Sequence, residues 1–205
     1  MNAPESYLTN YDRVCEYLNG VQKGQVAEIG RSAGDRPLLS VSYGEFEPFE
    51  RRATLSAALS AGMPEAFYGP GRDKQVLLIS AAVHGAEMES IAGVVNLLAL
   101  LETGRDLDGV EWPRLAEYAT SLRLVIVPVA NPDGRARIDS DDPVSWSEDE
   151  MEKYRHGLGV KGEPNGWMPG CFVPHPRNLE EDSFLGGYFN DAGVNPSHGV
   201  FLERE

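Results

Sequence analysis

The fold class of this 205-residue chain is decided by the segment VLLI at residues 76–79 and the segment LRLVIVPV at residues 122–129. Both are continuous apolar runs, which are typical of strands buried on both faces of a sheet. Between them, over about residues 87–102, apolar side chains such as Ile91, Val94 and Leu98 recur on one helical stripe. A strand, a helix and a second strand in this order predict a parallel pair joined by a right-handed crossover. We therefore expect an α/β fold.

The segments outside this unit are also mostly regular. Spacing and turn residues predict a helix over 5–20, a hairpin of strands 25–31 and 37–43, and helices near 54–61 and 113–120. After residue 130 the pattern weakens, and we expect residues 131–190 to form a long irregular loop region on the substrate side of the domain. Residues 139–152 hold seven acidic side chains and no basic one, which is typical of a solvated surface.

Composition excludes several classes of protein. The 18 basic and 32 acidic side chains give a net charge of −14, which disfavours binding to nucleic acid phosphates. No apolar run approaches the roughly 20 residues that cross a bilayer, and the first residues lack the features of a secretory signal. Two distant cysteines make no disulfide scaffold. We expect a cytoplasmic protein with neither a membrane nor a nucleic acid partner; the sequence predicts no oligomeric state.

Polar clusters follow each of the two apolar strands. HGAE at residues 84–87 follows the first, and NPDG at residues 131–134 follows the second. Open α/β sheets bind ligands beyond the carboxyl ends of their strands. His84 and Glu87 are spaced so that an imidazole nitrogen and a carboxylate can converge on one metal ion. The spacing equally allows a strand cap and a carboxylate in the first helical turn, and NPDG alone is also a common turn sequence.

Four segments, in order, resemble the M14 zinc carboxypeptidase family. They are IGRSAGDRPL at residues 29–38, HGAE at 84–87, NPDG at 131–134 and GVNPSH at 193–198. The resemblance spans about residues 5–200. It implies a mixed, largely parallel central sheet flanked by helices and incomplete at its C-terminal end. Residues 1–205 would then be the N-terminal portion of a single catalytic domain.

The resemblance also implies a chemistry. His84 and Glu87 correspond to the family's ligands for Zn²⁺, which activates water to hydrolyse a peptide or peptide-like amide bond. The family's third ligand, a histidine, and its general-base glutamate lie later in the sequence than Glu205. We therefore expect the chain to be truncated at its C-terminus, and we assign no catalytic residue within it. The expected substrate is a peptide or a small amide.

The expected substrate-binding residues depart from the family pattern. Ser197 and His198 stand where the family has the Asn-Arg pair that grips a terminal carboxylate. The candidates for a compensating charge are Arg135, Arg137, Arg155, Lys161 and Arg177. The family also has an arginine soon after NPDG that polarises the scissile carbonyl, and the resemblance makes Arg137 and Arg155 the candidates for this role. Two alternatives stay open. Related deacylases of N-acyl amino acids also carry H-x-x-E, and a truncated chain could be a non-catalytic remnant that binds a peptide or a partner.

Overall fold

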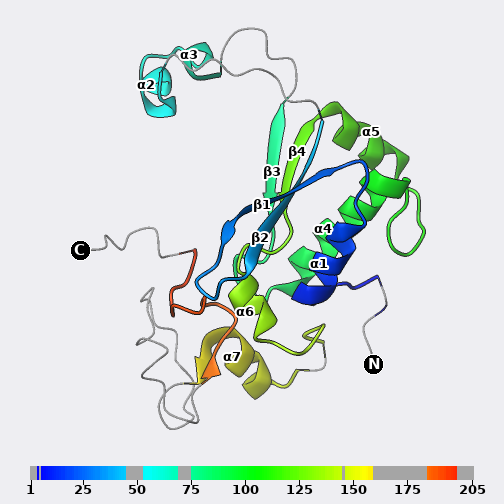
Figure 1. Ribbon diagram of the computed structural model, residues 1–205, viewed down its shortest axis with the longest axis vertical. Coiled ribbons are helices and arrows are strands. Elements are labelled where there is room, and N and C mark those ends of the chain that lie inside the picture. The colour runs from blue at the N-terminus through cyan, green and yellow to red at the C-terminus, as the bar shows by residue number, and fades with distance from the viewer. Residues whose placement is uncertain are drawn as a thin grey trace.

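A four-stranded mixed sheet lies at the centre of the computed structural model, which describes residues 4, 6–44, 53–68, 75–144, 146–158 and 184–197 (Figure 1). The strand order is β1-β2-β4-β3. The strands are β1 (Gln25–Arg31), β2 (Pro37–Tyr43), β3 (Val76–Ser80) and β4 (Arg123–Val127). The pairs β1·β2 and β2·β4 are antiparallel, whereas β3·β4 is parallel. The predicted hairpin and parallel pair are both confirmed, although the described pairings include more antiparallel than parallel ones.

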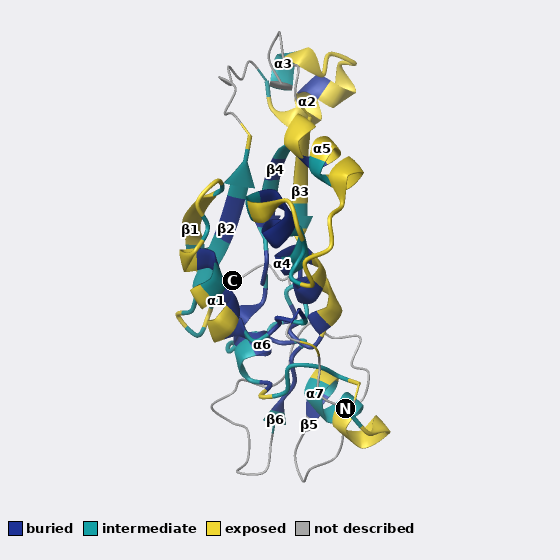
Figure 2. Ribbon diagram, turned by 90° about the vertical axis from the view of Figure 1, so that its right-hand side faces the viewer, coloured by how far each residue is buried: buried dark blue, intermediate teal, exposed yellow. Residues whose placement is uncertain are grey.

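Two helices cover one face of this sheet. They are α1 (Tyr11–Asn19) and α4 (Met88–Thr103). Ile91, Val95 and Leu98 of α4 are fully buried against Val41 of β2 and Ile126 of β4, in one apolar cluster that also includes residues of α1. Figure 2 shows the result, since α4 is largely buried while β1 is exposed. Helix α4 ends at Gly104, whose φ of +83° is the left-handed conformation that glycine adopts without strain.

Strand β3 departs from the sequence prediction. Residues 76–79 were expected to be buried on both faces, but Val76, Leu77 and Leu78 are 54%, 44% and 63% exposed. The prediction was wrong because apolar side chains favour burial but do not ensure it. A strand is buried on both faces only where other elements pack on both of them. β3 is the edge strand of the described sheet, and it pairs with β4 alone there. In β4, Leu124 and Ile126 are buried as expected.

The remaining elements are short. They are α2 (Leu55–Ser60), α3 (Glu65–Tyr68), α5 (Pro113–Ser121), α6 (Pro132–Ala136), α7 (Glu148–His156), β5 (Gly157–Leu158) and β6 (Phe184–Leu185). The acidic segment after residue 139 thus includes a helix, α7, whose start is fixed by a capping box between Ser147 and Glu150. Helices α6 and α7 and the β5·β6 pair all fall within residues 131–190, where an irregular region was expected. No helix in the described ranges has the length and apolar character needed to cross a membrane.

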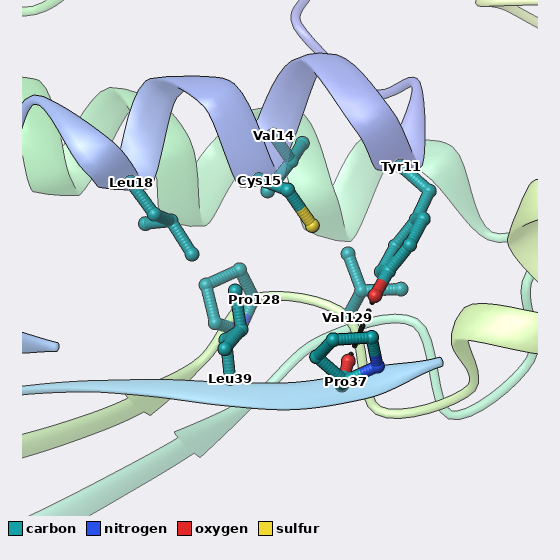
Figure 3. A pocket seen from close by; sticks show the side chains of 8 residues that line it. All are labelled: Tyr11, Val14, Cys15, Leu18, Pro37, Leu39, Pro128 and Val129. Carbon is teal, nitrogen blue, oxygen red and sulfur yellow. Dashed lines mark hydrogen bonds between the residues drawn. The ribbon is translucent and has the colours of Figure 1, made fainter. Parts of the chain in front are cut away.

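A small pocket lies between α1 and the sheet (Figure 3). Its walls are mostly apolar, and the Tyr11 hydroxyl donates a hydrogen bond of 2.8 Å to the Pro37 carbonyl beside it. Burial raises the pKa of the Cys15 thiol, which lines the same pocket, so this thiol is a poor nucleophile at neutral pH. The pocket belongs to the packing of α1 rather than to the polar clusters that follow β3 and β4.

Candidate metal centre

The loops that follow β3 and β4 lie side by side. The backbone N–H of Ala130 donates to the carbonyl of Ala81 at 2.8 Å, and that of Asn131 donates to Ala82 at 2.9 Å. The parallel pairing of β3 and β4 brings both loops to one edge of the sheet, as the sequence predicted. The approach is so close that a Cβ atom on Gly85 would lie 2.1 Å from the Arg135 backbone nitrogen. Glycine is therefore required within the HGAE segment.

His84 and Glu87 converge at this edge. His84 Nδ1 lies 2.8 Å from Glu87 Oε1. The His84 side chain is only 16% exposed, whereas the Glu87 side chain is 46% exposed. The pair is therefore anchored in the protein on the imidazole side and open to solvent on the carboxylate side. The two side chains thus lie close together, while their role as metal ligands stays a prediction.

The other ring nitrogen of His84 is held by two residues far away in the sequence. His84 Nε2 lies 3.1 Å from Asn195 Oδ1 and 2.9 Å from Ser197 Oγ. The backbone N–H of Ser197 also donates to Asn195 Oδ1, at 3.0 Å. A backbone N–H can only donate, so this atom of Asn195 must be the amide oxygen. In the tautomer that carries its proton on Nε2, His84 donates to this oxygen.

In that tautomer, the lone pair of a neutral His84 lies on Nδ1. Nδ1 then faces a Glu87 carboxylate oxygen 2.8 Å away, so its lone pair and the carboxylate can bind one cation, whereas in the other tautomer Nδ1 donates a hydrogen bond to Glu87. An imidazole nitrogen and a carboxylate oxygen are ligands that zinc accepts, and a hydrogen bond on the far ring nitrogen is the usual support of a metal-bound histidine. The residues present therefore fit two of the ligands of a zinc ion.

Tyr188 completes the surroundings of His84. Its ring stacks on the imidazole, with centroids 4.1 Å apart and an interplanar angle of 16°. On another side, the ring of His156 meets Tyr188 edge-on at 4.9 Å. Burial raises the pKa of the Tyr188 phenol, so its hydroxyl stays protonated at neutral pH. The described residues contain no group of three or more His, Cys, Asp or Glu side chains arranged to hold a metal.

The family model described as Peptidase_M14, zinc carboxypeptidase, matches residues 17–158. The chain belongs to this family. No curated protein is similar enough to match the chain. The resemblance expected from the four sequence segments is thus confirmed at the level of the family.

Solved structures of carboxypeptidases are also similar to this chain. A metallo-carboxypeptidase from Burkholderia cenocepacia has 24% identity over 61% of this chain and 28% of its own, with a TM-score of 0.44. Thrombin activatable fibrinolysis inhibitor has 16% identity over 91% of this chain and 37% of its own, with a TM-score of 0.44. Carboxypeptidase A from Helicoverpa armigera has 18% identity over 62% and 24%, with a TM-score of 0.32. The chain therefore spans less than two fifths of the length of these structures.

The expected substrate-binding residues lie in different environments in the structure. Arg137 is largely enclosed, and its guanidinium donates to the carbonyls of Leu185, Gly186 and Phe189 and to the Asp191 carboxylate. It is therefore occupied in holding backbone. Ser197 lies beside the His84–Glu87 pair, with its Oγ 2.9 Å from His84 Nε2. His198 lies outside the described residues.

Arg155 differs from Arg137 in exposure. It lies near the end of α7 and is exposed, and its guanidinium makes no ion pair or hydrogen bond with the described part of the chain. Its positive charge acts on the Tyr188 phenol, which in turn stacks on His84. Of the two candidate arginines, Arg155 is the one whose guanidinium pairs with no described residue, and its charge reaches Tyr188.

Sequence reasoning missed two contacts of His84. Asn195 stood within a quoted segment, but only the fold shows its oxygen at the imidazole. Tyr188 carried no signal at all, because a single tyrosine in a loop has no periodicity to interpret.

Proposed function

We propose that this chain contributes to the active site of a zinc-dependent metallocarboxypeptidase-type hydrolase that cleaves a peptide or peptide-like amide bond. The observation that carries the proposal is the pairing of His84 Nδ1 with Glu87 Oε1 at 2.8 Å, with the far nitrogen of the imidazole held by Asn195 and Ser197. His84 and Glu87 are the proposed ligands of the metal. Catalytic zinc sites usually have three protein ligands, so the third would come from a residue outside the described ranges.

Zinc bound at this pair would supply Lewis acidity, polarising a carbonyl and making water acidic enough to lose a proton near neutral pH. The protein's own contribution is to hold the ligands still. Asn195 and Ser197 hold the imidazole of His84 through Nε2, and the Tyr188 ring limits rotation of the imidazole by stacking on it. Outer contacts of this kind commonly decide how tightly a metal is held.

We propose Arg155 as the cation that attracts a carboxylate of the substrate. It is exposed and lies close enough to Tyr188 for its charge to act on the phenol. A guanidinium binds a carboxylate through two parallel hydrogen bonds, and the protonated Tyr188 hydroxyl is a further donor nearby. Ser197 at the imidazole and the following His198 belong to the same proposed subsite. The substrate class that fits is a peptide or small amide with a free carboxylate.

Metal binding is the experiment that tests the proposal. Zinc content per chain and Co²⁺ titration would be measured for the unaltered protein, His84→Ala and Glu87→Gln. The matched control is Glu89→Gln, another exposed carboxylate in the first turn of the same helix. Loss of a ligand should weaken binding by more than the roughly 10–100-fold that loss of an outer contact costs. An unaltered protein without metal, or a His84→Ala variant that binds as tightly, would contradict the proposal.

Substrate assays on the same preparations separate the related activities. Release of C-terminal amino acids from peptides supports the carboxypeptidase, and an Arg155→Ala variant should then raise KM more than it lowers kcat. Release of acyl groups from N-acyl amino acids would point to a deacylase instead. Peptide binding without either release would identify a non-catalytic binding protein.

A further inference from the structure

Two of the four family-like segments meet at a pair of aspartates away from the proposed metal ligands, and the second aspartate, Asp191, lies two residues before the last segment. Ser32 and Arg36 of the first segment contact Asp133 of the NPDG segment. Asp133 in turn binds the backbone of Asp191, close to the last segment. We call Asp133, Asp191, Arg36 and Arg137 the ion-pair hub. Among the described residues, none of these four makes a hydrogen bond or an ion pair with His84 or Glu87.

Asp133 is the buried centre of the hub. Its side chain is 0% exposed, and its Oδ1 accepts from Ser32 Oγ at 2.5 Å and from the Arg36 guanidinium at 2.8 Å. Its Oδ2 accepts from the backbone N–H groups of Gly34 and Asp191, at 3.0 and 3.1 Å. All four bonds are charge-assisted, which makes them stronger than neutral ones. The position of the Asp191 backbone is therefore tied to the hairpin turn.

Asp191 bridges the two arginines of the hub. Its Oδ2 lies 2.6 Å from Arg36, and its Oδ1 binds Arg137. Arg137 also binds the carbonyls of Leu185, Gly186 and Phe189. The hub thus holds both ends of the segment 185–191 through its backbone.

The same segment continues into the contacts of His84. We call residues 184–197 the strap. The Gly187 carbonyl accepts from the backbone N–H of Gly85 at 2.7 Å, directly beside His84. Tyr188 stacks on the imidazole, and Asn195 and Ser197 bind its Nε2. The hydrogen bonds at His84 Nε2 and the ring stacked on the imidazole therefore all come from the strap.

We propose that Asp191 is a positioning residue, which fixes the orientation of the His84 imidazole by anchoring the strap to the ion-pair hub. Ion pairs in protein interiors contribute little net stability, because desolvation offsets their attraction, but they can select one arrangement of a segment. Asp191 is suited to this task, since one carboxylate joins the arginine of the hairpin to the arginine that holds the strap's carbonyls. That the orientation serves metal binding rests on the function proposed above.

The test compares Asp191→Asn with Asp191→Glu and Asp141→Asn. Asp141 is a matched control, because it also faces two arginines, Arg13 and Arg135, and is similarly exposed, at 40% against 34% for Asp191. The first measurement is the NMR spectrum of the His84 ring in the metal-free protein, since stacking on Tyr188 gives its protons a ring-current shift. The second is Co²⁺ affinity together with the visible spectrum of the bound ion.

Asp191→Asn should move the His84 ring signals toward those of an unstacked histidine and weaken Co²⁺ binding about 10–100-fold. Asp191→Glu keeps the carboxylate, so its His84 ring signals and its Co²⁺ affinity should lie closer to those of the unaltered protein. Asp141→Asn should change neither the ring signals nor the affinity. Unchanged His84 signals in Asp191→Asn, or equal changes in both asparagine variants, would overturn the proposal. If Asp191→Asn does not fold, Arg36→Gln removes one partner of the same carboxylate from a partly exposed position and should shift the signals in the same direction.

The NMR signals and the Co²⁺ binding test the two proposals separately. An unaltered protein that binds no metal contradicts the zinc function, while the His84 ring signals still decide whether Asp191 positions the imidazole.

Discussion

Replacing Asp133 by asparagine probes the buried carboxylate that joins the hairpin turn to the NPDG segment. Each carboxylate oxygen of Asp133 accepts two hydrogen bonds in a site closed to solvent. Asparagine has nearly the same shape, but one of its two terminal groups is a donor. Whichever way the amide is placed, its NH₂ group faces groups that are already donors.

The two placements differ in cost. An NH₂ group at the Oδ2 position would face the backbone N–H groups of Gly34 and Asp191, which cannot reverse. At the Oδ1 position it would face Ser32, whose hydroxyl can turn, and Arg36, which can only donate. Hydrogen bonds to a charged group contribute about 1.5–3 kcal/mol each, and breaking a buried ion pair costs about 3–5 kcal/mol. We expect Asp133→Asn to lower the free energy of unfolding by about 3–5 kcal/mol.

Urea and thermal denaturation would measure this loss. For a chain of this length, about 3–5 kcal/mol corresponds to a fall in Tm of roughly 6–20 °C. The matched control is Asp35→Asn in the same hairpin, because Asp35 pairs with Arg31 at an exposed position and asparagine tolerates its positive φ. The control should unfold at the same midpoint as the unaltered protein. A loss below about 1 kcal/mol in Asp133→Asn would refute the reasoning from buried donors.

The pH dependence of the free energy of unfolding is a second test of the Asp133 carboxylate. Burial by itself would raise the pKa of Asp133, but the bonds from Ser32, the Asp191 backbone, Arg36 and Gly34 together hold it below its ordinary 3.8. Because the pKa of Asp133 is lower in the folded than in the unfolded state, its ionisation stabilises the folded protein above about pH 3.8. This stabilisation is lost as the pH falls through the pKa of the folded state. The unaltered protein should therefore lose stability below about pH 4. The difference between it and Asp133→Asn should shrink over the same range.

Two further substitutions test single contacts. Gly85→Ala would place a Cβ 2.1 Å from the Arg135 nitrogen and 2.2 Å from the Gly134 carbonyl carbon. It should lower both Tm and Co²⁺ affinity, and unchanged affinity would mean that the two loops can separate without disturbing His84. Ser147→Ala removes the side chain that caps α7 and should cost about 0.5–2 kcal/mol in urea denaturation. An unchanged midpoint would show that α7 unfolds independently of the sheet.

Local patterns predicted much of the fold. The bounds of β1 and β2 agree with the predicted hairpin, because alternation and turn residues act between near neighbours. The first helix shows the limit of such patterns. Tyr7 and Leu8 continue its apolar spacing, but the helix begins at Tyr11, because Asn10 caps it by accepting from the N–H groups of Asp12 and Arg13.

The sequence by itself determined the α/β class, the family and the HGAE segment, since each depends on residues close together in the chain. Only the tertiary structure decided that β3 lies at an edge and that Arg137 binds carbonyls. It also decided that the imidazole of His84 is held by Asn195 and Ser197, from 111 and 113 residues away. Contacts across such separations depend on how the whole chain packs, and no local spacing contains them.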